Sequence, residues 1–379
     1  MIYLDNSATT IPEPSVVNSF KQVAERYYAN PSSIHSMGAE VERLQEKART
    51  QAANLLQVHP NEIVFTSGGT EGNNLAIKGI AFQYKKRGNH IITTEIEHPS
   101  VYEACKSLED HGFKVTFLPV NEHGVVQLEQ LKAAITKDTI LVSIMHVNNE
   151  TGAIQPIQAI GKLLNDYPKI NFHVDAVQSI GKVPLPLKEE RIDLCTFSGH
   201  KIHGLKGTGL LYVKNNIRLS PLFHGGNQEN EVRSGTENVA GNVSFVRALR
   251  LLKEREKISM HDMKEQQILL LHRLSEIEGV HVNSTIDGAP HIINFSIPGL
   301  RAETVIHAMY EAGFVISTQS ACSSKRNDIS RILQAYGLSE EIAKSGLRVS
   351  LSYGTTKTEV EQFLQSLEET IIQLKEILE

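Results

Sequence analysis

The chain has 379 residues, of which 40% are hydrophobic and 21% are charged, a composition typical of a globular protein. A formal net charge of −5 argues against a large nucleic-acid-binding surface, and apolar runs such as residues 268–271 are too short to cross a bilayer. The start, MIYLDNSATT, has neither a basic nor an apolar leader region. We therefore expect a cytoplasmic protein of two domains with no nucleic-acid or membrane partner.

Strands and helices are predicted to alternate over the first 200 residues or so. Apolar residues recur at helical spacing between Val41 and Leu55, and several short apolar runs are typical of buried strands. This alternation predicts an α/β fold with a mainly parallel sheet covered by helices on both faces. The predicted strands are 62–67, 90–94, 140–145, 170–175, 193–198 and 209–213, and the predicted helices 41–56, 70–82 and 99–110.

The pattern changes after about residue 255, where mixed elements predict a smaller α+β domain. The expected elements are a charged helix at 257–278, strands at 281–284, 291–297 and 314–318, a helix at 302–312 and a terminal helix with Thr356 and Glu359 as a capping box. We expect a large domain at 15–255 and a small domain made of 1–14 and 256–379. The polar run 323–328 is the best candidate for a mobile loop.

The segment SGGTEGNN, residues 67–74, joins a predicted strand to a predicted helix. Its glycines allow the backbone to approach a ligand, and the free N–H groups at a helix N-terminus bind phosphate well. The alternative is an ordinary tight turn in which Thr70 is the N-cap. The segment is neither a G-x-G-x-x-G motif nor a Walker loop, which makes a nucleotide site a weak interpretation.

Two later segments place a carboxylate and an amine after strands. HVDAVQ contains Asp175 and Gln178, and SGHKIHG contains Lys201. If both strands belong to one parallel sheet, these side chains lie at the same edge, where ligands bind in such folds. A lysine, an aspartate and a phosphate-binding turn together suit pyridoxal phosphate: the lysine forms a Schiff base and the aspartate keeps the pyridine nitrogen protonated.

Simpler interpretations exist for the same residues. Asp175 could cap a helix or lie in a surface turn, and Lys201 could belong to a solvated loop. A zinc site made of Cys195, His200 and His203 lacks the usual ligand spacing.

Ten motifs occur in one order along the chain: YLDNSATT, NPSSIH, SGGTEGNN, EHPSV, VNNETGAIQP, HVDAVQ, SGHKIHGLKGTG, RSGTENV, SACSS and GLRVSLS. Together they resemble the cysteine desulfurases of the NifS/IscS type, a branch of the fold-type I pyridoxal-phosphate enzymes. The resemblance runs from Tyr3 to about Tyr353. It implies a large domain with a mainly parallel seven-stranded sheet flanked by helices.

The resemblance also implies a role for each matching residue toward the cofactor. Lys201 would form the Schiff base, Asp175 would pair with the pyridine nitrogen, and His98 would stack on the ring and move protons. Gln178 and Asn149 would contact the hydroxyl side of the ring. The expected phosphate ligands are Gly69, Thr70, Ser198, His200 and, from the neighbouring subunit of a homodimer, Thr236.

For the substrate, the resemblance implies that Arg348 binds the carboxylate of L-cysteine, with Asn30 and Asn149 assisting. Taken without the family pattern, His98 could be a satisfied core histidine and Arg348 a surface ion pair.

The three cysteines, Cys105, Cys195 and Cys322, are far apart, so we expect neither a disulfide framework nor a four-cysteine zinc site. Cys105 and Cys195 fall in apolar elements, whereas Cys322 lies among small and polar residues. The resemblance makes Cys322, on a loop at about 319–330, the residue that carries a persulfide.

The expected reaction converts L-cysteine to L-alanine and leaves sulfur on Cys322, from which a sulfur-acceptor protein takes it. The resemblance connects such acceptors to iron–sulfur cluster assembly, tRNA thiolation or thiamine synthesis. The alternatives are a selenocysteine lyase, another pyridoxal-phosphate lyase or aminotransferase that does not need Cys322, and a non-catalytic scaffold. Gln319, Leu205 and His203 depart from the family pattern, and none of them has an assigned catalytic role.

Overall fold

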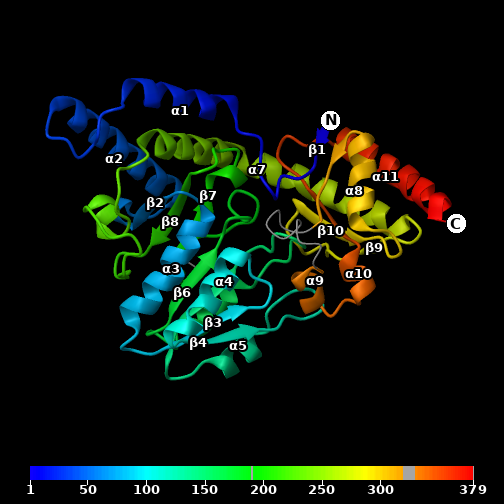
Figure 1. Ribbon diagram of the computed structural model, residues 1–379, viewed down its shortest axis with the longest axis horizontal. Coiled ribbons are helices and arrows are strands. Elements are labelled where there is room, and N and C mark those ends of the chain that lie inside the picture. Colours follow the sequence, from blue (N-terminus) through cyan, green and yellow to red (C-terminus); the bar gives the residue numbers. More distant parts are fainter. Residues whose placement is uncertain (189–190, 319–328, 379) are drawn as a thin grey trace.

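The computed structural model describes the backbone of residues 1–188, 191–318 and 329–378, and their side chains except at 257, 259 and 378 (Figure 1). No helix within these ranges is long and apolar enough to span a membrane. The helices are α1 (Pro14–Arg26), α2 (Ser36–Leu56), α3 (Gly69–Tyr84), α4 (Pro99–Ser107), α5 (Leu128–Ala134), α6 (Ile157–Leu164), α7 (Val239–Glu276), α8 (Ala302–Glu311), α9 (Arg331–Ala335), α10 (Glu340–Lys344) and α11 (Lys357–Leu378), with short 3-10 turns η1 (Pro60–Glu62), η2 (Glu109–His111), η3 (Gly199–Lys201) and η4 (Gln228–Glu231). The strands are β1 (Ile2–Tyr3), β2 (Ile63–Thr66), β3 (His90–Thr94), β4 (Lys114–Leu118), β5 (Thr139–Met145), β6 (Asn171–Asp175), β7 (Leu194–Ser198), β8 (Gly209–Val213), β9 (His281–Val282), β10 (Ile292–Ser296), β11 (Phe314–Val315) and β12 (Gly346–Ser350).

The largest sheet has seven strands in the order β2-β8-β7-β6-β5-β3-β4. The pairings from β7 to β4 are parallel, and β8 is antiparallel to both of its neighbours. Because β8 is reversed, β2 points in the same direction as β7. The predicted α/β fold with a mainly parallel seven-stranded sheet is confirmed, and β2 ends at the same edge as the parallel strands.

Side chains that alternate along each strand bury both faces of this sheet. In β2, Phe65 packs into the core formed with α2, α6 and α7, whereas Val64 packs into the core formed with α3 and α4. Tyr212 and Leu211 of β8 divide between the two cores in the same way. A strand that is covered on both faces needs apolar residues at every position, which explains the continuous apolar runs in the sequence.

A separate apolar core lies in the C-terminal part of the chain. It is built on the antiparallel sheet β12-β10-β9 together with α8 and α11, and it includes Leu4 from the N-terminus. The predicted capping box opens α11: the Thr356 backbone N–H donates to Glu359 Oε2 at 2.7 Å, and the Glu359 N–H donates to Thr356 Oγ1 at 3.2 Å. The N-terminal strand β1 pairs in parallel with β11.

The 38-residue helix α7 joins the two cores (Figure 1). Its first part packs on α1 and α2, and its later part contacts α11, β9 and β10. The helix predicted at 257–278 therefore begins much earlier, at Val239, where the Asn238 side chain accepts a hydrogen bond from the Gly241 N–H at 3.0 Å. The expected domain boundary between residues 255 and 256 falls inside this continuous helix.

A buried ion pair holds an unusual turn against the large sheet. Glu229, Asn230 and Glu231 all have left-handed backbone angles, with φ of 48°, 55° and 64°, although none of them is glycine. The Glu229 carboxylate accepts from Arg49 Nη1 at 2.8 Å, from Arg49 Nη2 at 2.9 Å and from the Phe65 backbone N–H at 2.8 Å. These contacts tie the turn to α2 and β2 and offset the strain of its backbone.

Replacing Glu229 with alanine should lower the free energy of unfolding by about 3–5 kcal/mol, because it leaves the buried Arg49 guanidinium without its buried anionic partner. Urea denaturation measures this loss. Glu46→Ala is the matched control: Glu46 binds the same guanidinium at 3.2 Å but is 60% exposed, so its loss should cost no more than about 1 kcal/mol. Equal losses in the two variants would contradict this account of the turn.

Candidate active site

A cavity of about 260 Å³ opens at the carboxyl edge of the seven-stranded sheet. Segments that leave β2, β3, β5, β6 and β7 contribute to its wall, since these strands all end at this edge. The wall is completed by the N-terminal segment and by β12 of the smaller sheet. The lining residues are Ser7, Ala8, Gly69, Thr70, Asn73, His98, Ser100, Met145, Val147, Asn149, Asp175, Val177, Gln178, Ser198, His200, Lys201 and Arg348.

The turn after β2 brings the N-terminus of α3 to this cavity. Gly68 is the N-cap position with φ of 146°, so the alternative with Thr70 as the N-cap is wrong. A Cβ atom on Gly69 would lie 2.9 Å from Val177 Cγ2, which shows how closely the turn packs. The free N–H groups of this 16-residue helix, together with Ser198 Oγ and His200 nearby, can bind an anion.

The carboxylate of Asp175 lies buried at the end of β6. Its Oδ2 accepts from Asn73 Nδ2 at 2.7 Å, and its Oδ1 accepts from the Val177 backbone N–H at 3.0 Å. Burial raises the pKa of Asp175, although both hydrogen bonds and the nearby Lys201 act against this. A cationic N–H donor from a ligand would stabilise the charged form of this buried carboxylate.

The amine of Lys201 lies at the end of the short turn η3, directly after β7. Its Nζ donates to the backbone oxygens of Ser7 and Ala8, the latter at 2.8 Å. The Lys201 backbone oxygen in turn accepts from Lys182 Nζ at 3.2 Å, and burial lowers the pKa of Lys182 to about 8. Hydrogen bonds to both the side chain and the backbone of Lys201 therefore hold this residue at the cavity.

Two histidines of the cavity are neutral at physiological pH. Burial, with the charges of Lys201 and Arg331, lowers the pKa of His98 to about 4, and its Nδ1 contacts Ser100 Oγ at 2.8 Å. Burial and the nearby Lys201 lower the pKa of His200 to about 3. Neutral imidazoles can accept a proton or stack on an aromatic ring without adding charge to the cavity.

Several buried polar atoms of the lining have no hydrogen-bond partner among the described residues. They are Asn73 Oδ1, Asn149 Oδ1, Gln178 Oε1, Ser198 Oγ and Arg348 Nε. Buried polar atoms are normally satisfied, so a group of them around one cavity indicates a polar ligand.

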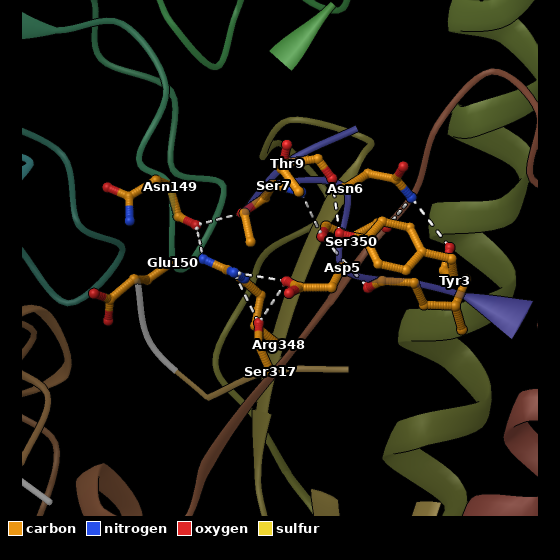
Figure 2. A network of polar contacts seen from close by, with 12 residues as sticks. Tyr3, Asp5, Asn6, Ser7, Thr9, Asn149, Glu150, Ser317, Arg348 and Ser350 are labelled. Atoms are coloured by element: carbon orange, nitrogen blue, oxygen red, sulfur yellow. Dashed lines mark hydrogen bonds and ion pairs between the residues drawn. The ribbon is translucent and has the colours of Figure 1, made fainter. Parts of the chain in front are cut away.

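Arg348 is almost completely buried in β12, at 1% exposure, and its side chain points toward Asp5 and Ser317 (Figure 2). Its Nη1 donates to the Asn149 backbone oxygen at 2.8 Å, and its Nη2 donates to Asp5 Oδ1 at 2.9 Å and to Ser317 Oγ at 2.7 Å. The alternative of a surface ion pair is therefore wrong for this arginine.

Two residues of the predicted site, Asn30 and Thr236, do not line this cavity. Asn30 is exposed, and its Oδ1 accepts from the Ser32 backbone N–H at 2.9 Å. Thr236 is also exposed and lines a different, smaller depression beside Arg233. Cys322 lies outside the described residues.

Sequence reasoning missed the N-terminal segment and Asn73 as parts of this site. Asn73 follows Thr70 by three positions and so lies on the same face of α3, a spacing that could have indicated its place. No local sequence pattern predicts that the backbone oxygens of Ser7 and Ala8 lie at the cavity, because their contacts with Lys201 join distant parts of the chain.

The other two cysteines are packing residues, as predicted. Cys105 and Cys195 are both free and fully buried, and burial raises the pKa of each thiol. Two residues of the zinc alternative have other contacts. Cys195 packs in the core of the large sheet, and His203 Nδ1 contacts the Ile11 backbone oxygen at 2.8 Å. Within the described part of the chain, no cluster of histidine, cysteine and acidic residues is suited to hold a metal ion.

Known proteins resemble this chain over nearly its full length. Residues 2–363 match the family described as aminotransferase class-V. A NifS/IcsS protein homolog of Lactobacillus delbrueckii subsp. bulgaricus is 44% identical over 97% of both chains, and the cysteine desulfurase IscS of Pectobacterium carotovorum is 42% identical over 99% of this chain and 94% of its own. A solved structure of a NifS-like protein superposes with a TM-score of 0.92 at 38% identity, covering 98% of this chain and 99% of the other.

The pKa of His200 predicts how the stability of the cofactor-free protein depends on pH. The unfolded chain binds a proton at the ordinary value near 6.5, whereas folded His200 binds one only near 3, so acid favours unfolding between these values. Relative to His200→Gln, the wild type should lose about 1–2 kcal/mol of unfolding free energy between pH 7 and pH 5. Urea denaturation at both pH values measures this difference, and parallel losses in the two proteins would contradict it.

Proposed function

The chain belongs to the class-V aminotransferase family, and we propose that it is a pyridoxal-phosphate-dependent cysteine desulfurase that converts L-cysteine to L-alanine. The observation that carries the proposal is that Lys201, Asp175 and Arg348 line a single cavity although they come from distant parts of the chain. Together they offer an amine, a carboxylate and a guanidinium to one ligand.

The donor set of the cavity fits pyridoxal phosphate, which is the cofactor of this family. Unpartnered Ser198 Oγ and the N-terminus of α3 would hold a phosphate, and the unpartnered amide oxygens of Asn149 and Gln178 face the same cavity. Asp175, whose pKa is raised by burial, would take the protonated pyridine nitrogen as its partner. Lys201 Nζ is the amine that would bind the aldehyde. When bound, this cofactor supplies an electron sink for negative charge on the substrate's Cα.

Lys201 and His98 are the groups in the cavity to which we assign the movement of the substrate's protons. Neutral His98 can accept a proton on its ring, and its low pKa means that it readily gives the proton up again. Ser100 fixes the ring through its Oγ and its backbone N–H, at 2.8 and 3.1 Å from His98 Nδ1. A fixed ring keeps the proton-transfer distance short.

Arg348 would bind the α-carboxylate of L-cysteine. Its guanidinium lies in the wall of the cavity that also contains Lys201, so an amino acid could present its amino group to one and its carboxylate to the other. A guanidinium suits this task because it carries a positive charge, and the Arg348 Nε–H has no partner among the described residues.

We assign the sulfur-accepting role to Cys322 from its sequence context, SACSS. The Cys322 thiolate attacks the sulfur of L-cysteine, an S–S bond forms, and the Cβ–S bond breaks with its electron pair left on the carbon side. Protonation at Cβ then yields L-alanine, so one thiol and one L-cysteine become one persulfide and one L-alanine. Cys322 follows Ser317 by five residues, a length of chain that spans at most about 18 Å, and Ser317 contacts Arg348.

The proposed enzyme needs two kinds of protein partner. One is a second copy of the chain, whose Thr236 would contribute to the phosphate site; Thr236 is exposed here and does not line the cavity of its own chain. The other is a sulfur-acceptor protein that takes the persulfide sulfur from Cys322.

Cys322→Ser should abolish the release of L-alanine from L-cysteine, because no thiolate remains to attack the sulfur. The cofactor's absorbance should stay that of the wild type, since Lys201 is intact, and borohydride should still fix the cofactor at position 201. Cys105→Ala is the control that should keep alanine release. If Cys322→Ser released alanine at the wild-type rate, the protein would be a lyase that does not use this thiol.

A homodimer should have a mass of about twice 42.1 kDa in sedimentation. Large apolar side chains are exposed between residues 11 and 37, among them Tyr28 at 74% and Ile34 at 104%, and a second copy would cover such a surface. Thr236→Ala should then weaken cofactor binding without changing this mass. A protein that binds the cofactor fully as a monomer would contradict the shared phosphate site.

A further inference from the structure

We propose that the N-terminal segment Asp5–Ala8 is a positioning segment that sets the place of Arg348 relative to Lys201, and so makes the enzyme select substrates with a carboxylate beside the reacting amine. The inference rests on the proposed function, in which Arg348 binds the carboxylate and Lys201 serves the amino end. It assigns a task to the YLDNSATT motif beyond the catalytic residues themselves.

One end of the segment holds Arg348 (Figure 2). Asp5 Oδ1 accepts from Arg348 Nη2 at 2.9 Å and from Ser317 Oγ at 2.8 Å, and Ser317 Oγ accepts from the same Nη2 at 2.7 Å. The three groups form a closed triangle, which restricts rotation of the guanidinium. Asp5 also supplies the negative charge that a buried arginine needs.

The other end of the segment holds the groups on the amine side of the cavity. The backbone oxygens of Ser7 and Ala8 accept from Lys201 Nζ, and Ser7 O also accepts from Gln178 Nε2 at 2.9 Å. Ser7 Oγ donates to the Asn149 backbone oxygen at 3.0 Å, and the same oxygen accepts from Arg348 Nη1 at 2.8 Å. The segment thus contacts the guanidinium through Asp5 and the amine through Ser7 and Ala8.

The segment is itself fixed to the strand that carries Arg348. Asn6 donates to the Ser350 backbone oxygen from its side chain at 2.9 Å and from its backbone at 3.3 Å. The Ser7 backbone N–H donates to Ser350 Oγ at 2.8 Å, and the Ser350 N–H donates to the Leu4 backbone oxygen at 2.7 Å. Asn6, Ser7 and Ser350 are all buried, so these bonds exclude water and resist displacement.

The spacing matters because the amino and carboxylate groups of an amino acid share one Cα. A site that binds both groups tolerates little change in the distance between its two receptors, and small displacements cost much of the rate. An amine without a carboxylate gains nothing from a well-placed Arg348. The segment should therefore affect amino acids and not simple amines.

The test compares binding of L-alanine with binding of ethylamine, its counterpart without the carboxylate, to the cofactor-loaded enzyme by its absorbance. Asp5→Ala should bind L-alanine about 10–100-fold more weakly, as expected for losing a hydrogen bond between charged groups, with ethylamine nearly unchanged. Asp5→Asn keeps an oxygen at the same place and should recover most of the preference. With L-cysteine as substrate, Asp5→Ala should raise KM more than it lowers kcat.

A further variant serves as a control and another as a second test, and thermal unfolding of every variant reports general damage. Tyr3→Phe removes the 2.8 Å hydrogen bond to the Thr9 backbone oxygen in the same stretch of chain without touching Arg348, and it should keep the wild-type preference. Ser317→Ala removes one corner of the triangle and should weaken L-alanine binding in the same direction as Asp5→Ala. If Asp5→Ala does not fold, L-alanine binding by Ser317→Ala tests the inference instead.

Arg348→Gln separates a failure of this inference from a failure of the proposed function. If Arg348→Gln loses the preference for L-alanine while Asp5→Ala and Ser317→Ala keep it, the positioning segment is wrong and the role of Arg348 stands. If Arg348→Gln keeps the preference, both are wrong. Tighter binding of L-alanine by Asp5→Ala would also overturn the inference, because Asp5 would then compete with the substrate.

Discussion

The common direction of five strands in the large sheet is the constraint on which the site depends. Because β2, β3, β5, β6 and β7 all end at one edge, the segments that follow them meet there, although more than 130 residues separate Gly69 from Lys201. The reversed β8 preserves this arrangement, since an antiparallel strand between β2 and β7 leaves those two strands pointing the same way. A ligand at this edge meets the helix N-terminus, a carboxylate and an amine together.

The edge of the sheet provides only part of the cavity. Arg348 belongs to the smaller antiparallel sheet, and Asp5–Ala8 comes from the start of the chain. Both are held by long-range hydrogen bonds, those of Ser350 and the Asn149 backbone oxygen in particular. The proposed carboxylate receptor thus depends on how the second core packs against the first, and the continuous helix α7 links the two cores.

Burial sets the electrostatics of the cavity. Burial lowers the pKa of His98 and His200 and raises that of Asp175, because it disfavours the charged form of each group. A ligand of opposite charge would stabilise these charged forms. The buried oxygens of Asn149, Gln178 and Ser198, which have no partner among the described residues, likewise favour a polar ligand. A cofactor with a phosphate and a protonated ring nitrogen would suit such a cavity, because the N-terminus of α3 and the Asp175 carboxylate offer groups of opposite charge.

The sequence by itself predicted six of the seven strands of the large sheet, all except β4, together with the capping box of α11 and the buried state of Cys105 and Cys195. These follow from local periodicity, and β3 and β8 match the predicted ranges at both ends. It also placed Asp175 and Lys201 after neighbouring strands, which was enough to predict one edge. Only the tertiary structure decided that α7 begins at Val239, that Arg348 is buried on Asp5, and that Ser7 and Ala8 face Lys201. Those contacts join residues between 190 and 345 positions apart, and no local spacing in a sequence encodes which backbone oxygen a distant side chain will meet.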